Sequence, residues 1–148
     1  MFIYHNLESI TYMESETQDR TKIMIVDDNL DILLSLRTLF EMEDFEVVIA
    51  DNGWKCLREL EKGFKGIIIL DLMMPIMDGV ETIKNMIIEG FIKDNIVIVL
   101  TVKKIQGEEF DEIYPYIYDY ITKPFDIDRL LNIVKNITQK KVRKKYLL

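Results

Sequence analysis

The stretch IIILDLMMPIMDG, residues 67–79, decides the fold. Ile67–Leu70 is an unbroken apolar run, which is typical of a strand that is buried on both faces. An acidic residue, Asp71, follows this strand at once, and a loop that contains Pro75 comes next. Apolar residues then recur at helical spacing and predict a helix over Asp78–Glu89. A buried strand, a loop and a helix in this order indicate one unit of a parallel α/β sheet.

The same alternation of strand and helix continues along the chain in both directions from this stretch. Further strands are predicted at Ile23–Val26, Phe45–Ile49, Ile96–Leu100 and Tyr116–Ile121, and further helices at Leu30–Met42, Asn52–Lys62, Gln106–Ile113 and after the capping residue Asp126. The aromatic residues Phe40, Phe45 and Trp54 are expected in the core. We therefore predict an α/β fold, a doubly wound five-stranded parallel sheet with five helices and right-handed crossovers.

The composition suits one globular domain. The chain has 148 residues, of which 49% are apolar and 30% charged, so the disordered class is excluded for the chain as a whole. A single cysteine, Cys56, excludes a disulfide framework and fits a reducing cytoplasm, where we expect the protein. No apolar run approaches the ~20 residues of a membrane span, so we expect no membrane insertion.

The net charge of −7 argues against binding of nucleic acid over the whole surface, because phosphates would be repelled. The charge is uneven, since residues 135–148 hold six basic residues and no acidic one. A solvated helix end is the favoured interpretation of this segment, because cations there complement the helix dipole. Contact with nucleic acid or with an acidic partner is the alternative.

Polar residues follow four of the predicted strands. Asp27 and Asp28 follow the first strand, Asp71 the third, Thr101 the fourth and Lys123 the fifth. Ligands of open α/β sheets bind beyond the carboxyl ends of the strands. Three carboxylates at one edge repel one another unless a cation neutralises them, and such an oxygen site suits Mg²⁺. A lysine and a hydroxyl beside Mg²⁺ suit a phosphoryl group, toward which a carboxylate can act as the nucleophile.

Five segments in order carry a resemblance to a known family. They are IMIVDDN at 23–29, ADNG at 50–53, ILDLMMPIMDG at 69–79, VLT at 99–101 and DYITKPF at 119–125. Asp28 and Asp71 lie 43 positions apart, Asp71 and Thr101 30, and Thr101 and Lys123 22. Over roughly residues 21–138 the chain resembles a response-regulator receiver domain, the phosphoacceptor module of two-component signalling. It is similar to the single-domain regulators of chemotaxis and sporulation, which have a flavodoxin-like fold.

The resemblance implies a role for each site residue. Asp71 is the phosphoacceptor, and the Mg²⁺ ligands are Asp28, Asp71, the backbone carbonyl of Met73 and, through a water molecule, Asp27. Lys123 pairs with Asp71 at rest and with the phosphoryl oxygens afterwards. Thr101 donates its hydroxyl to the phosphoryl group, and Tyr120 is the aromatic residue that rotates inward when Thr101 moves. The peptide bond between Lys123 and Pro124 is expected to be cis.

The resemblance also implies a function and a division of the chain. Residues 1–20 are expected to be a mobile leader, residues 21–138 the receiver domain, and residues 139–148 a basic helix end or tail. The protein accepts a phosphoryl group from a histidine kinase or phosphotransfer protein and signals by protein contact. It is not an enzyme, beyond catalysing its own phosphorylation and dephosphorylation. The alternatives are a pseudo-receiver, which binds partners without phosphorylation, and a receiver fragment of a longer regulator. A small-substrate phosphohydrolase is disfavoured, because Met73 stands where that class has a second acidic residue.

Several positions depart from the family pattern. Val102 replaces the small residue that usually follows the switch threonine, and this larger side chain is expected to crowd the path of Tyr120. Tyr114, Tyr116 and Tyr118 lie on or near the face of the fourth helix, fifth strand and fifth helix, through which the family contacts downstream targets or dimerises. They are expected either to make this face more adhesive or to pack inward. Met73 and Lys103 cannot orient an attacking water as a carboxylate or amide does, so we expect slow self-dephosphorylation.

Overall fold

The computed structural model describes residues 20–102 and 106–146, with side chains through Lys140. Its centre is one sheet of five parallel strands in the order β2-β1-β3-β4-β5. The strands are β1 (Lys22–Val26), β2 (Glu46–Ala50), β3 (Ile67–Asp71), β4 (Ile96–Thr101) and β5 (Ile117–Thr122). The predicted α/β fold class is therefore confirmed.

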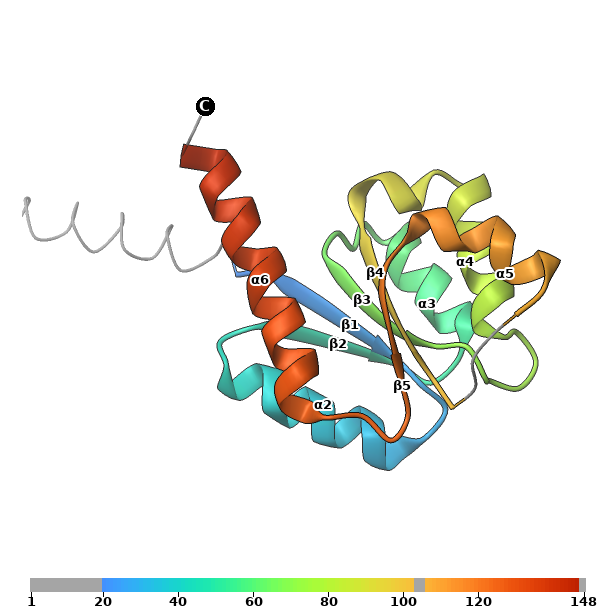
Figure 1. The fold of residues 1–148 in the computed structure, drawn as a ribbon, viewed down its shortest axis with the longest axis horizontal. Coiled ribbons are helices and arrows are strands. Elements are labelled where there is room, and N and C mark those ends of the chain that lie inside the picture. The colour runs from blue at the N-terminus through green and yellow to red at the C-terminus, as the bar shows by residue number, and fades with distance from the viewer. Residues whose placement is uncertain (1–19, 103–105, 147–148) are drawn as a thin grey trace, which may run out of the picture.

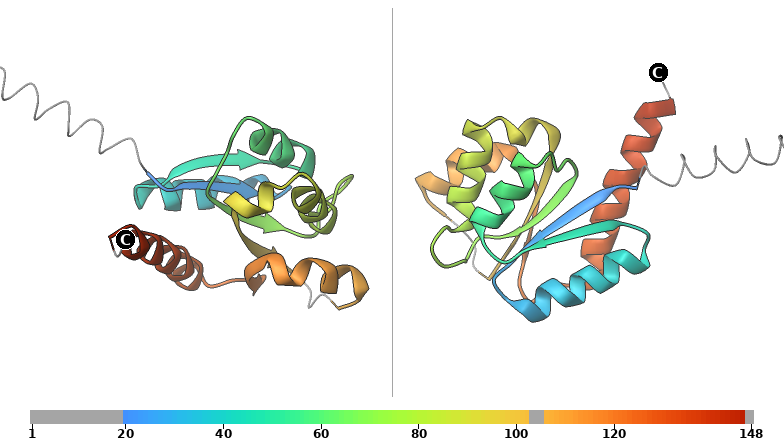
Figure 2. Two further views of the ribbon diagram at one scale, coloured as in Figure 1. Left: turned by 90° about the horizontal axis from the view of Figure 1, so that it is seen from above. Right: turned by 180° about the vertical axis from the view of Figure 1, so that it is seen from behind.

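Helices cover both faces of this sheet (Figure 1). They are α2 (Leu30–Met42), α3 (Gly53–Glu61), α4 (Gly79–Ile88), α5 (Glu108–Ile113) and α6 (Ile127–Tyr146). One face carries α2 and α6, and the opposite face carries α3, α4 and α5, as the turned views show (Figure 2). Two short 3-10 helices, η1 (Phe91–Asp94) and η2 (Tyr114–Tyr116), complete the elements of the described residues. None of the helices that the structure describes is both long and apolar enough to cross a membrane.

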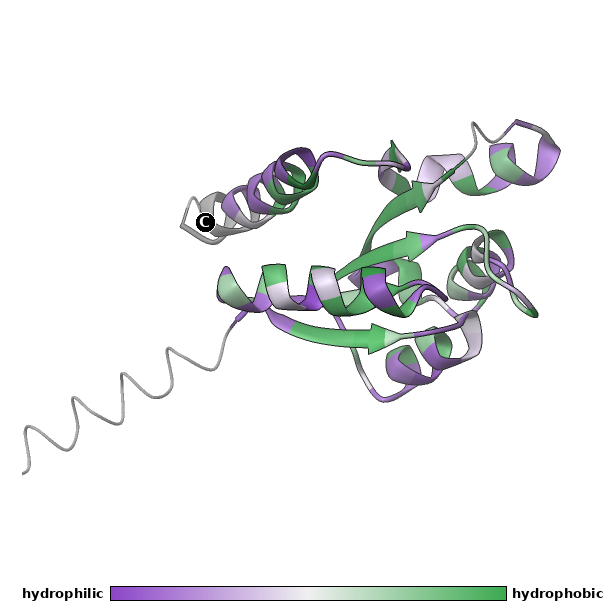
Figure 3. Cartoon of the chain, turned by 90° about the horizontal axis from the view of Figure 1, so that it is seen from below, coloured by the Kyte–Doolittle hydropathy of each residue, from purple (hydrophilic) through white to green (hydrophobic). Residues whose placement is uncertain are grey.

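The two-sided cover explains the unbroken apolar runs of the strands. On β3, Ile67 and Ile69 belong to the core under α2 and α6, whereas Ile68 and Leu70 belong to the core under α3, α4 and α5. All four side chains are fully buried. Figure 3 shows the result: the strands are almost uniformly hydrophobic, whereas the helices alternate between apolar and polar residues.

The register of the strands brings their carboxyl ends to one edge of the sheet. Val26 of β1 pairs with Leu70 of β3, and Leu70 pairs with Val99 of β4. Thr101 at the end of β4 pairs with Thr122 of β5. The residues that follow these positions therefore meet at the same edge.

The structure differs from the sequence prediction in a few places. Trp54 was expected in the core, but it is 58% exposed, because the inward stripe of α3 is formed by Gly53, Cys56 and Leu60 and leaves position 54 outside. The 3-10 helix η1 was not predicted. Phe40 and Phe45 do lie in the core, with their ring centroids 5.8 Å apart in an edge-on arrangement.

The structure describes less of the expected N-terminal leader than of the expected C-terminal tail. Residues 1–19 of the expected leader and residues 147–148 of the expected basic tail lie outside the described residues. The helix α6 continues through Lys140 to Tyr146, so most of the basic segment has a helical backbone. This part of α6 projects beyond the sheet (Figure 1).

Candidate functional site

Three carboxylates gather at the carboxyl edge of the sheet. Asp27 directly follows β1 and Asp71 is the last residue of β3, and both are almost fully buried, at 1% and 4% exposure. Asp28 stands beside them and is exposed. One carboxylate oxygen of each of the three residues lies within 4.8 Å of the others. The strand register thus makes an acidic cluster from residues that are far apart in the sequence.

One lysine neutralises part of this charge. Lys123 Nζ donates to Asp27 Oδ2 at 2.6 Å and lies 3.4 Å from Asp71 Oδ2. The expected partner at rest was Asp71, whereas here the lysine bridges both aspartates and lies closer to Asp27. With all three carboxylates ionised and Lys123 protonated, the cluster has a charge of −2, which matches a divalent cation.

The backbone around Lys123 directs this side chain into the site. The N–H of Lys123 donates to the carbonyl of Thr101 at 2.7 Å, which extends the pairing of β5 with β4 by one residue. The Lys123–Pro124 peptide bond is cis. Asp27 Oδ1 accepts the N–H of Asn29 at 2.9 Å, so both oxygens of this buried carboxylate have a partner.

The pKa of Asp71 is raised above its usual range. Burial is the largest cause, because the charged form is removed from water, and the nearby charge of Asp27 acts in the same direction. The N–H of Met73, which donates to Asp71 Oδ1 at 3.0 Å, and Lys123 both lower the pKa and offset part of this rise. Burial and the charge of Asp27 therefore disfavour the ionised form of Asp71, and a cation at the site would stabilise that form.

The loop after Asp71 is shaped by a close backbone approach. The N–H of Gly79 donates to the carbonyl of Leu72 at 3.0 Å. A Cβ on Gly79 would lie 2.6 Å from the carbonyl oxygen of Asp71, so only glycine fits there. Gly79 belongs to the motif at 69–79, but its role in this close approach was not predicted. The sequence signal for this role is a glycine at the first position of the helix that follows the acidic strand end.

Two side chains of this loop face solvent. Met73 is 51% exposed, and Ile76 is 90% exposed and has a φ of 71°. A β-branched residue in the left-handed region is strained, since its Cβ approaches the backbone. The outer side of the site is therefore apolar and open, in contrast to the buried carboxylates beneath it.

Thr101 and Tyr120 lie on neighbouring strands beside the cluster. Thr101 is fully buried at the end of β4. Tyr120 on β5 is half-buried and packs against the core under α3, α4 and α5. Val102 is 54% exposed, so at least half of this residue lies in solvent. Tyr114, Tyr116 and Tyr118 are exposed, so they do not pack inward.

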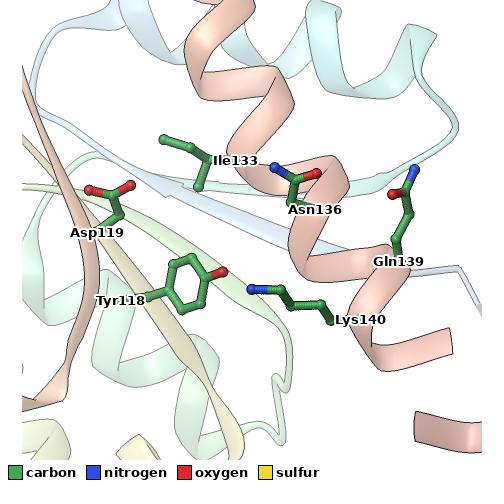
Figure 4. A pocket seen from close by; sticks show the side chains of 6 residues that line it. All are labelled: Tyr118, Asp119, Ile133, Asn136, Gln139 and Lys140. Carbon is green, nitrogen blue, oxygen red and sulfur yellow. The ribbon is translucent and has the colours of Figure 1, made fainter. Parts of the chain in front are cut away.

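A hollow lies between β5 and α6, away from the carboxylates. It is lined by Tyr118, Asp119, Ile133, Asn136, Gln139 and Lys140, whose side chains surround it in Figure 4. Among the residues that the structure describes, Asn136, Gln139 and Lys140 have no side-chain hydrogen bond or ion pair. This hollow is thus a polar surface with donors and acceptors left for water or a partner.

The comparisons with known proteins agree on one family. The model of the family described as "Response regulator receiver domain" matches residues 23–135. The Transcriptional regulatory protein CpxR homolog of Haemophilus influenzae is 32% identical over 123 residues, and the chain covers 51% of its length. The Chemotaxis protein CheY of Listeria monocytogenes is 31% identical over 115 residues, which are 77% of this chain and 95% of that protein. The chain thus spans about half of the first relative and nearly all of the second.

Solved structures show the same fold. A CheY-like receiver domain protein from Methanospirillum hungatei is 33% identical, with a TM-score of 0.74, and the match covers 79% of this chain and 93% of that chain. The response regulator TrrA of Thermotoga maritima, solved in complex with Mg²⁺ and beryllofluoride, is 28% identical. Its TM-score is 0.66, and the match covers 78% of this chain and 97% of that one.

Proposed function

Because this chain belongs to the response regulator receiver domain family of two-component signalling, we propose that it is a switch operated by phosphorylation of Asp71. The observation that supports this most is the cluster of Asp27, Asp28 and Asp71 with Lys123 at the carboxyl edge of the sheet. The phosphoryl donor is a histidine kinase or a phosphotransfer protein. The output is contact with another protein.

The transfer step uses the Asp71 carboxylate as the nucleophile. An oxygen of Asp71 attacks the phosphorus of a phosphohistidine, the P–N bond breaks, and the histidine nitrogen keeps the electron pair. The product is an acyl phosphate on Asp71. Lys123 stands 3.4 Å from Asp71 Oδ2 and supplies positive charge beside the transferred group, so the catalysis is mainly positioning and electrostatics.

The carboxylates suit a Mg²⁺ ion. Oxygen donors from Asp28, Asp71 and the backbone carbonyl of Met73 would hold it, with Asp27 acting through a water molecule. The bound ion would supply positive charge that offsets the charges of Asp71 and of the incoming phosphoryl group. The charge of the cluster and the hard character of its donors both favour this ion over softer metals.

Side chains at the ends of the two neighbouring strands would contact the phosphoryl group. Thr101 at the end of β4 would donate its hydroxyl to the new dianion, and Lys123 would contact another phosphoryl oxygen. Movement of Thr101 toward the site would leave space that Tyr120 fills. This is a packing change driven by a local change of charge.

The output face consists of α5, β5 and α6. Tyr114, Tyr116 and Tyr118 are 62%, 45% and 45% exposed on this side, and Tyr118 also lines the hollow of Figure 4. Exposed tyrosines are frequent in protein interfaces, because they bury a large area and keep a polar tip. We propose this face for a downstream protein or for a second copy of the chain.

The test is the intact mass of the protein after incubation with acetyl phosphate and Mg²⁺. We expect the gain of one phosphoryl group, its absence when Mg²⁺ is chelated, and its absence in Asp71→Asn. Asp51→Asn is the matched control, because Asp51 also follows a strand but is exposed and pairs with Lys55 at 2.8 Å. A phosphorylated Asp71→Asn variant would overturn the assignment. An unmodified wild-type chain that also fails to bind beryllofluoride would favour a pseudo-receiver.

We also propose that the acyl phosphate is long-lived. Hydrolysis needs a water molecule aligned with the phosphorus, and the exposed Met73 has no group that orients water. The other position invoked for this, Lys103, lies outside the described residues. Met73→Asn should shorten the half-life of the phosphorylated protein by roughly tenfold, since an amide can position water. The half-life is read by mass spectrometry, with Met73→Leu as the control, and equal half-lives for the three proteins would contradict this proposal.

A further inference from the structure

The helix α5 is held to the molecule by few contacts. It comprises six residues, and a helix of this length is not stable by itself, so it depends on packing. Ile113 is its one fully buried residue, and Phe110 is half-buried. The ion pair of Lys84 with Glu112, at 3.2 Å, is largely exposed and adds little. The helix starts after Gly107, whose φ of 127° is accessible to glycine alone, and no side chain caps it.

The ring of Phe110 connects two tyrosines. Its centroid lies 6.1 Å from that of Tyr120, with an angle of 54° between the planes. On the helix side it lies 5.6 Å from that of Tyr114, at 56°. Tilted pairs at these distances attract one another. A chain of three rings thus runs from β5, next to the strand that ends in Thr101, to a tyrosine that is 62% exposed.

We propose that Phe110 is a positioning residue for Tyr120, and that it links the state of the carboxylate site to the exposed Tyr114. This inference rests on the proposed role of Tyr120 in the switch. Tyr120 turns inward by giving up the ring contact seen here, and Phe110 then keeps only its ring contact with Tyr114. Because α5 has few other anchors, the adjoining surface at Tyr114, the first residue of η2, changes with it.

The contact should favour the state without a phosphoryl group. Phe110→Leu removes an interaction that is made in that state and given up on switching, so it should tighten the binding of a phosphoryl mimic. The expected gain in affinity for beryllofluoride with Mg²⁺ is roughly two- to tenfold, the equivalent of one aromatic pair. A purely structural role of Phe110 would weaken binding or leave it unchanged.

The experiment is ¹⁹F NMR of the full chain labelled with 3-fluorotyrosine and titrated with beryllofluoride and Mg²⁺. The fluorine signal of bound beryllofluoride reports filling of the site in the same spectrum. The signals of Tyr114 and Tyr116 are assigned with Tyr114→Phe and Tyr116→Phe. Tyr116 is the internal control, because it is also exposed but has no ring contact among the described residues.

We expect the Tyr114 signal to move as the site fills, with a smaller change at Tyr116. In Phe110→Leu the site should fill at lower beryllofluoride concentration and the Tyr114 response should disappear. Phe110→Tyr, which keeps the ring, should restore both. Thermal melts confirm that each variant is folded.

Two results would overturn the inference. One is a Phe110→Leu variant that binds beryllofluoride with unchanged or weaker affinity and keeps the Tyr114 response. The other is a wild-type Tyr114 signal that does not move although bound beryllofluoride is visible. Absence of the bound signal would instead contradict the proposed function itself, and with it this inference.

Discussion

The carboxylate edge and the α5 surface lie on the same molecule but are built differently. The edge consists of the ends of buried strands, whose side chains are placed by the register of β1, β3 and β5. The α5 surface rests on a short helix, two apolar anchors and exposed aromatic rings. Charges need rigid support to stay close together, whereas a switching element has to be easy to move. We therefore expect the carboxylate edge to contribute more to the stability of the fold than the α5 surface does.

The largest expected effect is the loss of a buried isoleucine from each region. Ile69→Ala in β3 should lower the free energy of unfolding by about 4 kcal/mol, because a cavity between packed layers cannot collapse. Ile113→Ala in α5 should cost about 2 kcal/mol, since the short helix can relax. Both side chains are fully buried, so they are a matched pair in urea denaturation. Equal losses of unfolding free energy in the two variants would contradict the expected difference in rigidity between the carboxylate edge and the α5 surface.

The next effect concerns the charge of the edge. Asp71→Asn should stabilise the protein by roughly 1–3 kcal/mol at pH 7, because a buried carboxylate beside Asp27 is replaced by a neutral amide. The pKa of Asp71 is raised in the folded state, so its ionisation disfavours folding above that pKa and costs nothing below the unfolded value.

The gain from Asp71→Asn should therefore shrink as the pH falls through the folded pKa of Asp71. Thermal melts at several pH values measure it. Asp119→Asn on β5 is the counterpart away from the carboxylate edge: its Oδ1 accepts the N–H of Tyr120 at 2.7 Å, a bond that an amide oxygen can keep. We expect no stabilisation there. A similar gain in stability from Asp71→Asn and Asp119→Asn would show that the cost of a charged carboxylate is not particular to the edge.

A smaller effect is expected in the loop that borders the edge. Ile76→Asn should raise stability by about 0.5–1 kcal/mol, because asparagine tolerates the positive φ that strains isoleucine. Ile88→Asn is the control, since Ile88 is also exposed but ends the helix α4. Chemical denaturation compares the two. A loss of stability in Ile76→Asn would mean that the Ile76 side chain contributes contacts that outweigh its backbone strain.

The smallest effect belongs to the ion pair that joins α5 to α4. Glu112→Gln should change stability by less than about 0.5 kcal/mol, because both side chains are solvated. The small difference in stability between this variant and the wild type should disappear at high salt, because salt screens exposed charges. A larger loss would give α5 an electrostatic anchor and weaken the contrast between the two regions.

The sheet could be predicted from the sequence because its signal is local. Four-residue apolar runs such as Ile67–Leu70 are typical of strands that helices cover on both faces, and the structure has this cover. The strand ends then bring Asp27, Asp28, Asp71 and Lys123 together without further information. The family resemblance added the roles of these residues, which geometry alone does not assign.

The features that could not be predicted from the sequence depend on packing between helices and strands. Trp54 looked like a core residue from its size, but which face of α3 is buried is decided by Cys56 and Leu60. The sharing of Lys123 between two aspartates depends on distances that spacing does not contain. The contact of Phe110 with Tyr120 joins a helix to a strand, and no periodicity within either element predicts it.

The bond from Lys123 to Asp27 joins residues 96 positions apart, and this has a consequence for synthesis on the ribosome. A nascent chain that has formed β1 to β4 holds the carboxylates but still lacks the lysine that neutralises them. The last strand, β5, leads into this lysine, so under the proposed function Asp71 gains its cationic neighbour only when the whole sheet has formed.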